Sequence, residues 1–259
     1  MKIKILYEDK NLLVIDKPSG VAVHGNGKTK EKTIADWVIE NYPSIKNVGE
    51  PIVTDNGEKI LRPGIIHRLD KETSGVLLIA KNKKTFEFLK EQFQKHIIKK
   101  TYRAFVYGFV PEPKASLLNG KRGVINAPIG RSPQDIRAYT AGRGARLPLR
   151  DAITEYIVLN CFTDTKNKNK EKNPEHQFSY IEAYPKTGRT HQIRVHMRYI
   201  NHPIVSDPLY RGNKNLALNM KRLALHASSV TFNMPNGEQK TIEAPSSTDF
   251  KKIIKEYIS

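Results

Sequence analysis

Cysteine is nearly absent from this chain of 259 residues, which carries Cys161 alone. A single thiol excludes an internal disulfide framework and any metal site built from several thiolates. We expect Cys161 to be a buried hydrophobic side chain, because it lies in the apolar stretch 156–162. Long apolar runs are also missing, and none approaches the roughly 20 residues of a membrane-spanning helix.

The start of the chain lacks the features of a secretory signal. Residues 1–8 alternate like a strand, without an apolar block or a small-residue cleavage site. We therefore expect a cytoplasmic protein with no membrane partner. The length allows one large domain or two modest ones, and a single domain over residues 1–259 is our expectation.

Acidic residues are too few to balance the basic ones. The chain has 44 Lys and Arg against 26 Asp and Glu, a formal net charge of +18. Such an imbalance is typical of a protein that binds the dense phosphates of nucleic acid. The alternative is a genome that favours lysine and places ammonium groups on any surface. Composition leaves both open, so the positions of the charges must decide.

Periodicity predicts strands and helices along most of the chain. Residues 1–8 and 12–17 should form a hairpin, and Thr33 with Asp36 should cap a short helix. The spacing of Phe86, Leu89 and Phe93 predicts another helix. The pattern also predicts strands at 76–80 and 101–108 and an amphipathic helix at 249–258. Residues 156–163 and 178–184 should form a hairpin whose tip is the charged run 166–172.

Two segments resist this interpretation. Residues 111–150 are rich in Gly, Pro and Arg, which indicates either turns with short strands on a rim that faces RNA or a mobile loop. The run 25–29 superficially suggests a phosphate-binding loop, but the full spacing of that motif is absent, so we interpret it as a turn.

Asp70 stands in a polar loop that runs from Arg62 to Gly75, directly before an apolar strand. Arginine nearby favours an ionised carboxylate, and an ionised carboxylate can act as a nucleophile. The alternative is that Arg68 and Asp70 form an ion pair that only ties down a turn. The residue types alone do not separate these two roles.

A second basic segment covers residues 187–198, in which Thr190 can cap a helix. In a helix, Ile193, Met197 and Ile200 share one face, and His191, Arg194 and Arg198 line another. The basic face could hold a carboxylate or RNA phosphates, or it could simply be solvated. His191 and His196 lie five residues apart, which does not fit a helical zinc site, so no metal is indicated.

Together these segments resemble the RluA family of pseudouridine synthases. The run His67-Arg68-Leu69-Asp70-Lys71-Glu72-Thr73-Ser74-Gly75 is similar to the signature loop of that family. Further similar segments follow the same order along the chain: 12–21, 100–104, 187–196 and 223–227. The resemblance covers most of residues 6–245 and leaves 111–175 poorly matched.

The resemblance implies a role for individual residues. Asp70 would be the catalytic nucleophile, Tyr102 would pack on the target base and assist loss of its carbon-5 proton, and Arg194 would pair with the aspartate. Arg68 would fill the space that the flipped nucleotide leaves. The expected contacts to substrate come from His67, Arg68, Arg189, His191, Gln192 and Arg198. The family uses no cofactor and no metal.

The same resemblance implies an α+β fold. Its long, mixed and largely antiparallel sheet would carry Asp70 in a central cleft, with flanking helices. We expect a monomeric catalytic domain without an N-terminal RNA-binding extension, so that loops 111–150 and 164–175 select the RNA. Ser206 stands where the family usually has glycine, which puts the turn before Asp207 in doubt.

Three functions remain to be separated. Uridine isomerisation comes first, with ribosomal RNA ahead of transfer RNA as substrate. The second is RNA binding or remodelling with isomerase activity lost or secondary. The third is glycosidic cleavage without rejoining, which usually needs two carboxylates. Glu72 and Asp207 are conceivable second carboxylates, although we expect both to be surface residues.

Overall fold

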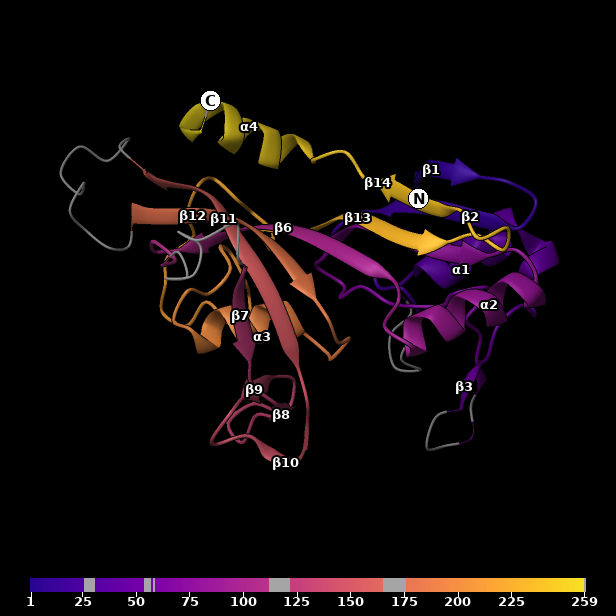
Figure 1. Ribbon diagram of the computed structural model, residues 1–259, viewed down its shortest axis with the longest axis horizontal. Helices are drawn as coiled ribbons and strands as arrows, with labels where there is room; N and C mark the ends of the chain where they lie inside the picture. The colour runs from indigo at the N-terminus through magenta and orange to yellow at the C-terminus, as the bar shows by residue number, and fades with distance from the viewer. Residues whose placement is uncertain (26–30, 54–56, 58, 112–121, 165–175, 259) are drawn as a thin grey trace. The chain divides into compact units, whose positions relative to one another are not determined.

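The computed structural model describes residues 1–25, 31–53, 57, 59–111, 122–164 and 176–258 (Figure 1). The chain divides into two compact units. Unit 1 contains Met1–Lys100 and Ala227–Pro245, and unit 2 contains Thr101–His226 and Ser246–Ser259. Among the described helices, none has both the length and the apolar character needed to cross a membrane.

Unit 1 is built on antiparallel strands. Strand β1 (Lys4–Glu8) pairs with β2 (Leu12–Lys17), and β2 pairs with β5 (Ser74–Ala80). Next comes β13 (Leu225–Asn233), which also pairs with β14 (Gln239–Glu243). The predicted hairpin of β1 and β2 is confirmed. Its turn is held by Asp9, whose Oδ1 accepts the N–H groups of Asn11 and Leu12, both at 2.7 Å.

Helices and two short strands complete unit 1. Helix α1 (Ile34–Asn41) begins with the predicted capping box between Thr33 and Asp36, and a 3-10 turn η1 (Pro43–Ile45) follows it. Helix α2 (Lys83–Gln94) begins at the cap residue Asn82 and buries Phe86 and Leu89, as their spacing predicts. A minimal hairpin joins β3 (Ile52–Val53) to β4 (Lys59–Ile60).

Strand β5 forms the centre of unit 1, because all seven of its residues are buried. Leu12 and Val14 of β2 pack with Val76 and Leu78 of β5 in one hydrophobic cluster. At the start of β5, Gly75 has φ +115°, and a Cβ there would lie 2.1 Å from the carbonyl oxygen of Ala227. Only glycine fits so close an approach of two backbones. The apolar run 76–80 therefore forms the buried strand that the sequence predicts.

Unit 2 contains a second set of antiparallel strands. Their order is β6 (Lys99–Tyr107), β12 (Gln177–Pro185), β11 (Ile153–Thr163) and β7 (Gly123–Asn126). A separate small sheet has the order β10 (Arg146–Arg150), β8 (Ile129–Arg131) and β9 (Tyr139–Ala141). Helices α3 (Gln192–Tyr199) and α4 (Thr248–Tyr257) complete this unit.

These elements settle several expectations for unit 2. The strand at 101–108, the hairpin of β11 with β12 and the C-terminal helix are confirmed. For residues 122–150 the alternative of short strands is confirmed. The charged hairpin tip 166–172, most of loop 164–175, residues 112–121 and most of the turn 25–29 lie outside the described residues.

The expectation of a buried cysteine is wrong. Cys161 is exposed on β11, while its neighbour Phe162 is buried. Successive residues of a strand point to opposite faces of the sheet, and Phe162 takes the face toward the core. The Sγ atom of Cys161 lies 3.4 Å from Oγ of Ser179 on the adjacent strand. An apolar stretch therefore does not imply burial of every residue in it.

Candidate active site

The loop that carries Asp70 is fastened to the end of β2 by a buried lysine. Lys17 has no exposed surface, and its Nζ donates to the carbonyl oxygens of Pro18 (2.9 Å), Val21 (2.8 Å) and Lys71 (3.0 Å). The Oγ of Ser19 donates to the carbonyl oxygen of Glu72 at 2.6 Å. The residues directly after Asp70 are thus held by hydrogen bonds from the turn that ends β2.

On the other side of Asp70, His67 fixes the loop to β5. The backbone N–H of Leu78 donates to Nε2 of His67 at 3.0 Å, and the imidazole ring stacks on Phe93 of α2. Burial, together with the charges of Lys100 and Arg62, lowers the pKa of His67 to about 3. His67 is therefore neutral at physiological pH. Its contacts favour a positioning role over the contact with RNA that we expected.

Cationic side chains surround this loop within unit 1. Burial lowers the pKa of Arg62, and the nearby charge of Arg68 adds to this effect. Burial also lowers the pKa of His24, with smaller contributions from Arg68 and Arg62. For Lys100, burial lowers the pKa to about 8. Asp70 itself is half-buried, and its carbonyl oxygen accepts the N–H of Thr73 at 3.1 Å. Positive charges of Arg62, Arg68 and Lys100 thus lie close to His24 and His67, near the start of the loop that carries Asp70.

Tyr102 belongs to unit 2, where it lies on β6 opposite Ala183 of β12. It is half-buried and packs against the hydrophobic cluster that includes Ile193 and Val195 of α3. The next pair along the ladder, Arg103 and Glu182, forms an ion pair with Nε and Oε1 3.1 Å apart. Because successive residues of a strand point to opposite faces, Tyr102 and this ion pair lie on opposite faces of β6.

Arg194 makes a buried, bidentate ion pair with Asp207. Its Nε and Nη2 donate to Oδ2 and Oδ1 of Asp207 at 2.8 and 2.9 Å. Arg194 is 4% exposed and Asp207 is fully buried, so the expectation that Asp207 is a surface residue is wrong. Oδ1 of Asp207 also accepts the N–H groups of Leu209 and Tyr210. This carboxylate is engaged on all sides, which is how a buried charge is stabilised.

Helix α3 is buried on nearly every side, because its first six residues, Gln192–Met197, are all buried. For Arg194 the alternative of pairing with a carboxylate is confirmed, whereas Arg198 is exposed as a solvated basic face requires. Thr190 does not cap the helix. The cap position belongs to His191, which has φ +56° and makes no side-chain capping bond within the described part of the chain.

His191 takes part in a polar contact at the start of α3. Its Nδ1 lies 2.8 Å from the hydroxyl of Tyr210, which also accepts the backbone N–H of Tyr139 at 3.0 Å. The Tyr210 ring lies beneath the Arg194 guanidinium, 4.9 Å from Cζ to the ring centroid. His191, Tyr210, Arg194 and Asp207 therefore form one connected group in unit 2.

Gln192 cannot contact RNA in the way we expected, because its side chain is buried and satisfied. Its Nε2 donates to the carbonyl oxygen of Ile153 and to Oγ1 of Thr154, at 2.9 and 3.0 Å. Its Oε1 accepts from Oγ1 of Thr187 and from the N–H of Arg189, at 2.6 and 3.0 Å. These four bonds use the whole capacity of an amide side chain.

The remaining expected RNA ligands differ in exposure. Arg189 is half-buried and donates from Nε to the carbonyl oxygen of Asp151 at 2.9 Å. Arg68 and Arg198 are exposed. The predicted site residues thus fall into two groups: Asp70, Arg68 and His67 in unit 1, and Tyr102, Arg194, Arg189, His191, Gln192 and Arg198 in unit 2.

Ser206 takes the backbone conformation that glycine favours, with φ +57°. Its Oγ donates to the carbonyl oxygen of Met220 at 2.7 Å, and the side chain is 5% exposed. The turn before Asp207 therefore keeps a left-handed residue although glycine is replaced. The doubt about this turn is resolved in favour of an intact Asp207 position.

Two residues of this arrangement were missed from the sequence. Lys17 was not singled out, although a lysine that ends the buried run Leu12–Ile15 is an unusual place for a cation. Asp207 was assigned to the surface because charged residues in turns usually are exposed. The sequence carries no signal for this burial, because the bonds to Oδ1 of Asp207 from the N–H groups of Leu209 and Tyr210 appear only in the structure.

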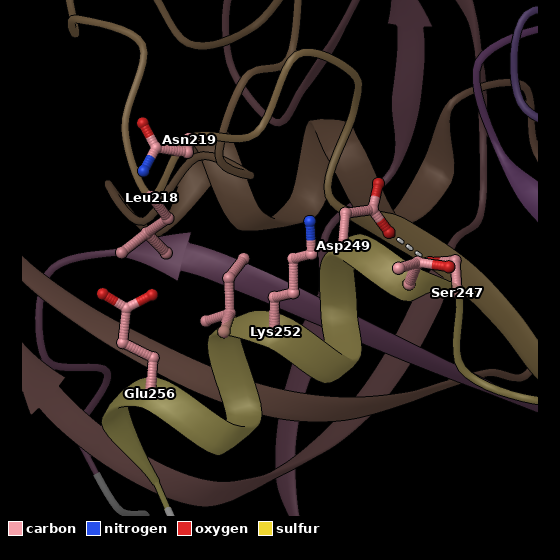
Figure 2. A pocket seen from close by; sticks show the side chains of 8 residues that line it. Leu218, Asn219, Ser247, Asp249, Lys252 and Glu256 are labelled. Atoms are coloured by element: carbon pink, nitrogen blue, oxygen red, sulfur yellow. Dashed lines mark hydrogen bonds between the residues drawn. The ribbon is translucent and has the colours of Figure 1, made fainter.

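A cavity of about 570 Å³ in unit 2 contains none of the predicted site residues. It lies between α4 and the segment at Leu218 and Asn219 (Figure 2). On its wall, Asp249 is bound by Arg222, with Nε 2.6 Å from Oδ2. The cavity is thus separate from the group around Arg194.

Comparison with known proteins identifies the family. The model of the family described as RNA pseudouridylate synthase matches residues 11–199, which run through both units. An uncharacterized RNA pseudouridine synthase of Bacillus subtilis is 34% identical over 255 residues, covering 98% of this chain and 72% of that protein. The ribosomal large subunit pseudouridine synthase D of Borreliella burgdorferi is 33% identical over 255 residues, covering 98% of this chain and 65% of that protein.

Solved structures agree with this result. Human RNA pseudouridylate synthase domain containing 4 has a TM-score of 0.66 at 25% identity, covering 97% of this chain and 92% of that one. Human RNA pseudouridylate synthase domain containing 1 has a TM-score of 0.70 at 23% identity and covers 95% of this chain and 84% of that one, a likeness of fold. The α+β pseudouridine synthase fold is confirmed. This chain belongs to the RNA pseudouridylate synthase family and is an RluA-type RNA pseudouridine synthase.

Proposed function

We propose that this enzyme isomerises uridine in ribosomal RNA, with Asp70 as the nucleophile. The observation that carries the assignment of Asp70 is its loop, which Lys17, Ser19 and His67 fasten on both sides within a cationic surrounding. A reactive group held rigidly before a buried strand is positioned for chemistry. Relatives named ribosomal large subunit pseudouridine synthase D, at 33–34% identity, support ribosomal RNA ahead of transfer RNA.

In the proposed reaction Asp70 assists cleavage of the bond between uracil N1 and the ribose C1′. The freed uracil rotates and forms a new bond from its C5 to C1′, and the C5 proton is lost while N1 gains one. Tyr102 packs on the base and assists removal of that proton. Arg194 pairs with the aspartate, and Arg68 fills the space of the flipped nucleotide, whose extrusion costs a few kcal/mol.

The roles of the other residues follow from their contacts. We assign Arg189, His191 and Arg198 to RNA contact and assign His67 and Gln192 to positioning. Asp207 holds Arg194, so Arg194 is pre-organised and needs no rearrangement when substrate binds. We further propose that both units act together as one catalytic domain in a monomer, which the family match through both of them supports.

The alternative of glycosidic cleavage without rejoining finds less support. Such hydrolysis usually needs a second carboxylate as acid or base. Asp207, one candidate for it, is fully buried and bound to Arg194. The alternative of RNA binding without turnover finds less support, because the chain belongs to a family of RNA pseudouridine synthases.

Release of tritium from RNA labelled at carbon 5 of uridine tests the proposal. We expect the wild-type enzyme to release tritium from ribosomal RNA and Asp70→Asn to release none while it still binds RNA. Free uracil in place of pseudouridine would establish hydrolysis, and no release from any cellular RNA would refute isomerisation. Mapping pseudouridines in RNA from cells with and without the gene then identifies the modified uridine.

A further inference from the structure

Arginine and lysine are distributed unequally along this chain. Of its 44 basic residues 30 are lysine and 14 are arginine, yet residues 122–152 contain six arginines and no lysine. At the overall ratio about two of those six would be arginine. A genome that merely favours lysine does not explain this segment, which we call the arginine arm. Its members are Arg122, Arg131, Arg137, Arg143, Arg146 and Arg150.

The small sheet of the arm places two of these arginines directly opposite each other. Strands β8 and β10 belong to the same small sheet (Figure 1). Arg146 of β10 pairs in register with Arg131 of β8. Like charges directly opposite on neighbouring strands destabilise a sheet. Both guanidinium groups bind the loop that follows β8: Arg131 donates to the carbonyl oxygen of Ile136 and Arg146 to that of Pro133, at 3.0 and 3.1 Å. Both strands therefore hold this loop in place.

Two apolar side chains are exposed on the arm, Leu147 on β10 and Ile136 in the loop between β8 and β9. Leu147 is 84% exposed and Ile136 is 80% exposed. All five residues of β10 are exposed, so this strand has no face toward a core. One exposed apolar residue is ordinary on a protein surface. Two nearly fully exposed ones, one on β10 and one in the adjacent loop after β8, indicate a surface that binds a partner.

An exposed aromatic ring lies beside the arm. Tyr199, the last residue of α3, is 52% exposed, and its ring lies against Gly142 at the end of β9. A Cβ at position 142 would lie 3.0 Å from Cε2 of that ring. Arg143 follows directly and is exposed. The arm therefore presents guanidinium groups, apolar tips and an aromatic face together.

We propose that the arginine arm is a binding surface for structured RNA. The exposed Arg143 and Arg150 bind phosphates, Leu147 and Ile136 press against bases, and Tyr199 stacks on an unpaired base. Guanidinium groups bind phosphate with two parallel hydrogen bonds and stack on bases, whereas ammonium groups act as point charges. Apolar wedges that separate stacked bases are a recurring device of proteins that bend nucleic acid.

The charge of the arm favours RNA as the occupant. Its acidic residues are Asp135 and Asp151, and Asp135 is already bound by Arg137, with Oδ2 2.8 Å from Nη2. Guanidinium groups bind carboxylates as well as phosphates, so the choice of RNA rests on the substrate of this enzyme family. The inference deepens the proposed function, because it rests on RNA as the substrate and names the surface that selects it.

Binding of RNA by the full chain tests the arm without any turnover. Fluorescence anisotropy would use a labelled hairpin from large-subunit ribosomal RNA and a single strand of equal length. Arg143→Ala with Arg150→Ala should weaken hairpin binding on the order of tenfold. The slope of log Kd against log salt concentration should also fall by about 1 for each arginine that contacts phosphate. Lys83→Ala with Lys84→Ala, an equal loss of exposed charge on α2, should leave both nearly unchanged.

The apolar tip is tested separately. Leu147→Ser should weaken binding of the hairpin roughly tenfold and leave binding of the single strand unchanged, because only paired bases need to be separated. Equal losses in the lysine and arginine variants would overturn the proposal, since general charge would then explain binding. RNA affinity unchanged in all arm variants would assign the arm to a protein partner. Failure of these tests would leave the proposed isomerisation standing, because tritium release by the wild type measures it separately.

Discussion

Replacement of Lys17 by methionine would remove the ammonium that fastens the Asp70 loop while it keeps the volume of the side chain. Three hydrogen bonds are lost, to the carbonyl oxygens of Pro18, Val21 and Lys71. Each bond from a charged donor contributes about 1.5–3 kcal/mol. The variant also no longer buries an ammonium, which offsets several kcal/mol. The free energy of unfolding should therefore fall by about 2–4 kcal/mol.

Two measurements would follow this change. The melting temperature should drop by roughly 5–15 °C, given the size of the protein. In the tritium-release assay kcat should fall about a hundredfold with a smaller effect on KM, because misplacement of a reacting group by about 1 Å has that effect. Lys83→Met, an exposed lysine of α2, should stay within about 0.5 kcal/mol of the wild type.

The reasoning would be refuted by a Lys17→Met protein that melts and turns over like the wild type. If that protein does not fold, Ser19→Ala provides a milder test of the same fastening. It removes only the hydrogen bond from Oγ to the carbonyl oxygen of Glu72 and should lower stability by about 1 kcal/mol. A loss of kcat in this variant at nearly wild-type stability would support positioning of the loop.

Three further predictions concern single features of the site. Arg194→Met leaves the buried carboxylate of Asp207 unpaired and should lower the free energy of unfolding by about 3–5 kcal/mol, and adding Asp207→Asn should recover part of it; additive losses in urea unfolding would contradict this coupling. Ser206→Gly should be more stable than Ser206→Ala by about 1 kcal/mol, because both lose the bond to Met220 but only glycine relieves φ +57°; equal melting temperatures would argue against strain. Because the folded pKa of His67 is about 3, its contribution to stability is complete above pH 6.5 and is lost as pH falls from 6.5 toward 3, by up to about 1.4 kcal/mol per pH unit. His67→Gln should show a shallower decline of unfolding free energy over that range, and an unchanged slope would disprove the assignment.

Local patterns predicted the elements whose interactions are close in sequence. The capping box of Thr33 and Asp36 and the apolar spacing of Phe86 and Leu89 are both satisfied within one helix. The resemblance named the family and its fold. Periodicity could not show that Arg194 is buried, because an arginine on a helix face looks the same whether it meets solvent or an aspartate.

The errors have a common physical origin in contacts between distant segments. Cys161 was expected to be buried because its neighbours are apolar, but Phe162 occupies the side toward the core. Gln192 was assigned to RNA, yet its partners Ile153 and Thr154 come from β11, about forty positions earlier in the chain. Such partners are invisible in a pattern that repeats every two or four residues.

The fastening of the Asp70 loop determines where adaptation to substrate takes place. Hydrogen bonds reach this loop from the end of β2 and from β5, the buried centre of unit 1. Hydrogen exchange of the backbone amides in this loop therefore requires β5 to lose its packing, which is close to unfolding of the whole unit. A loop of this kind does not close over its ligand, so the deformation falls on the RNA. A uridine that is already unstacked in a bulge or a terminal loop then reacts in preference to one within a duplex.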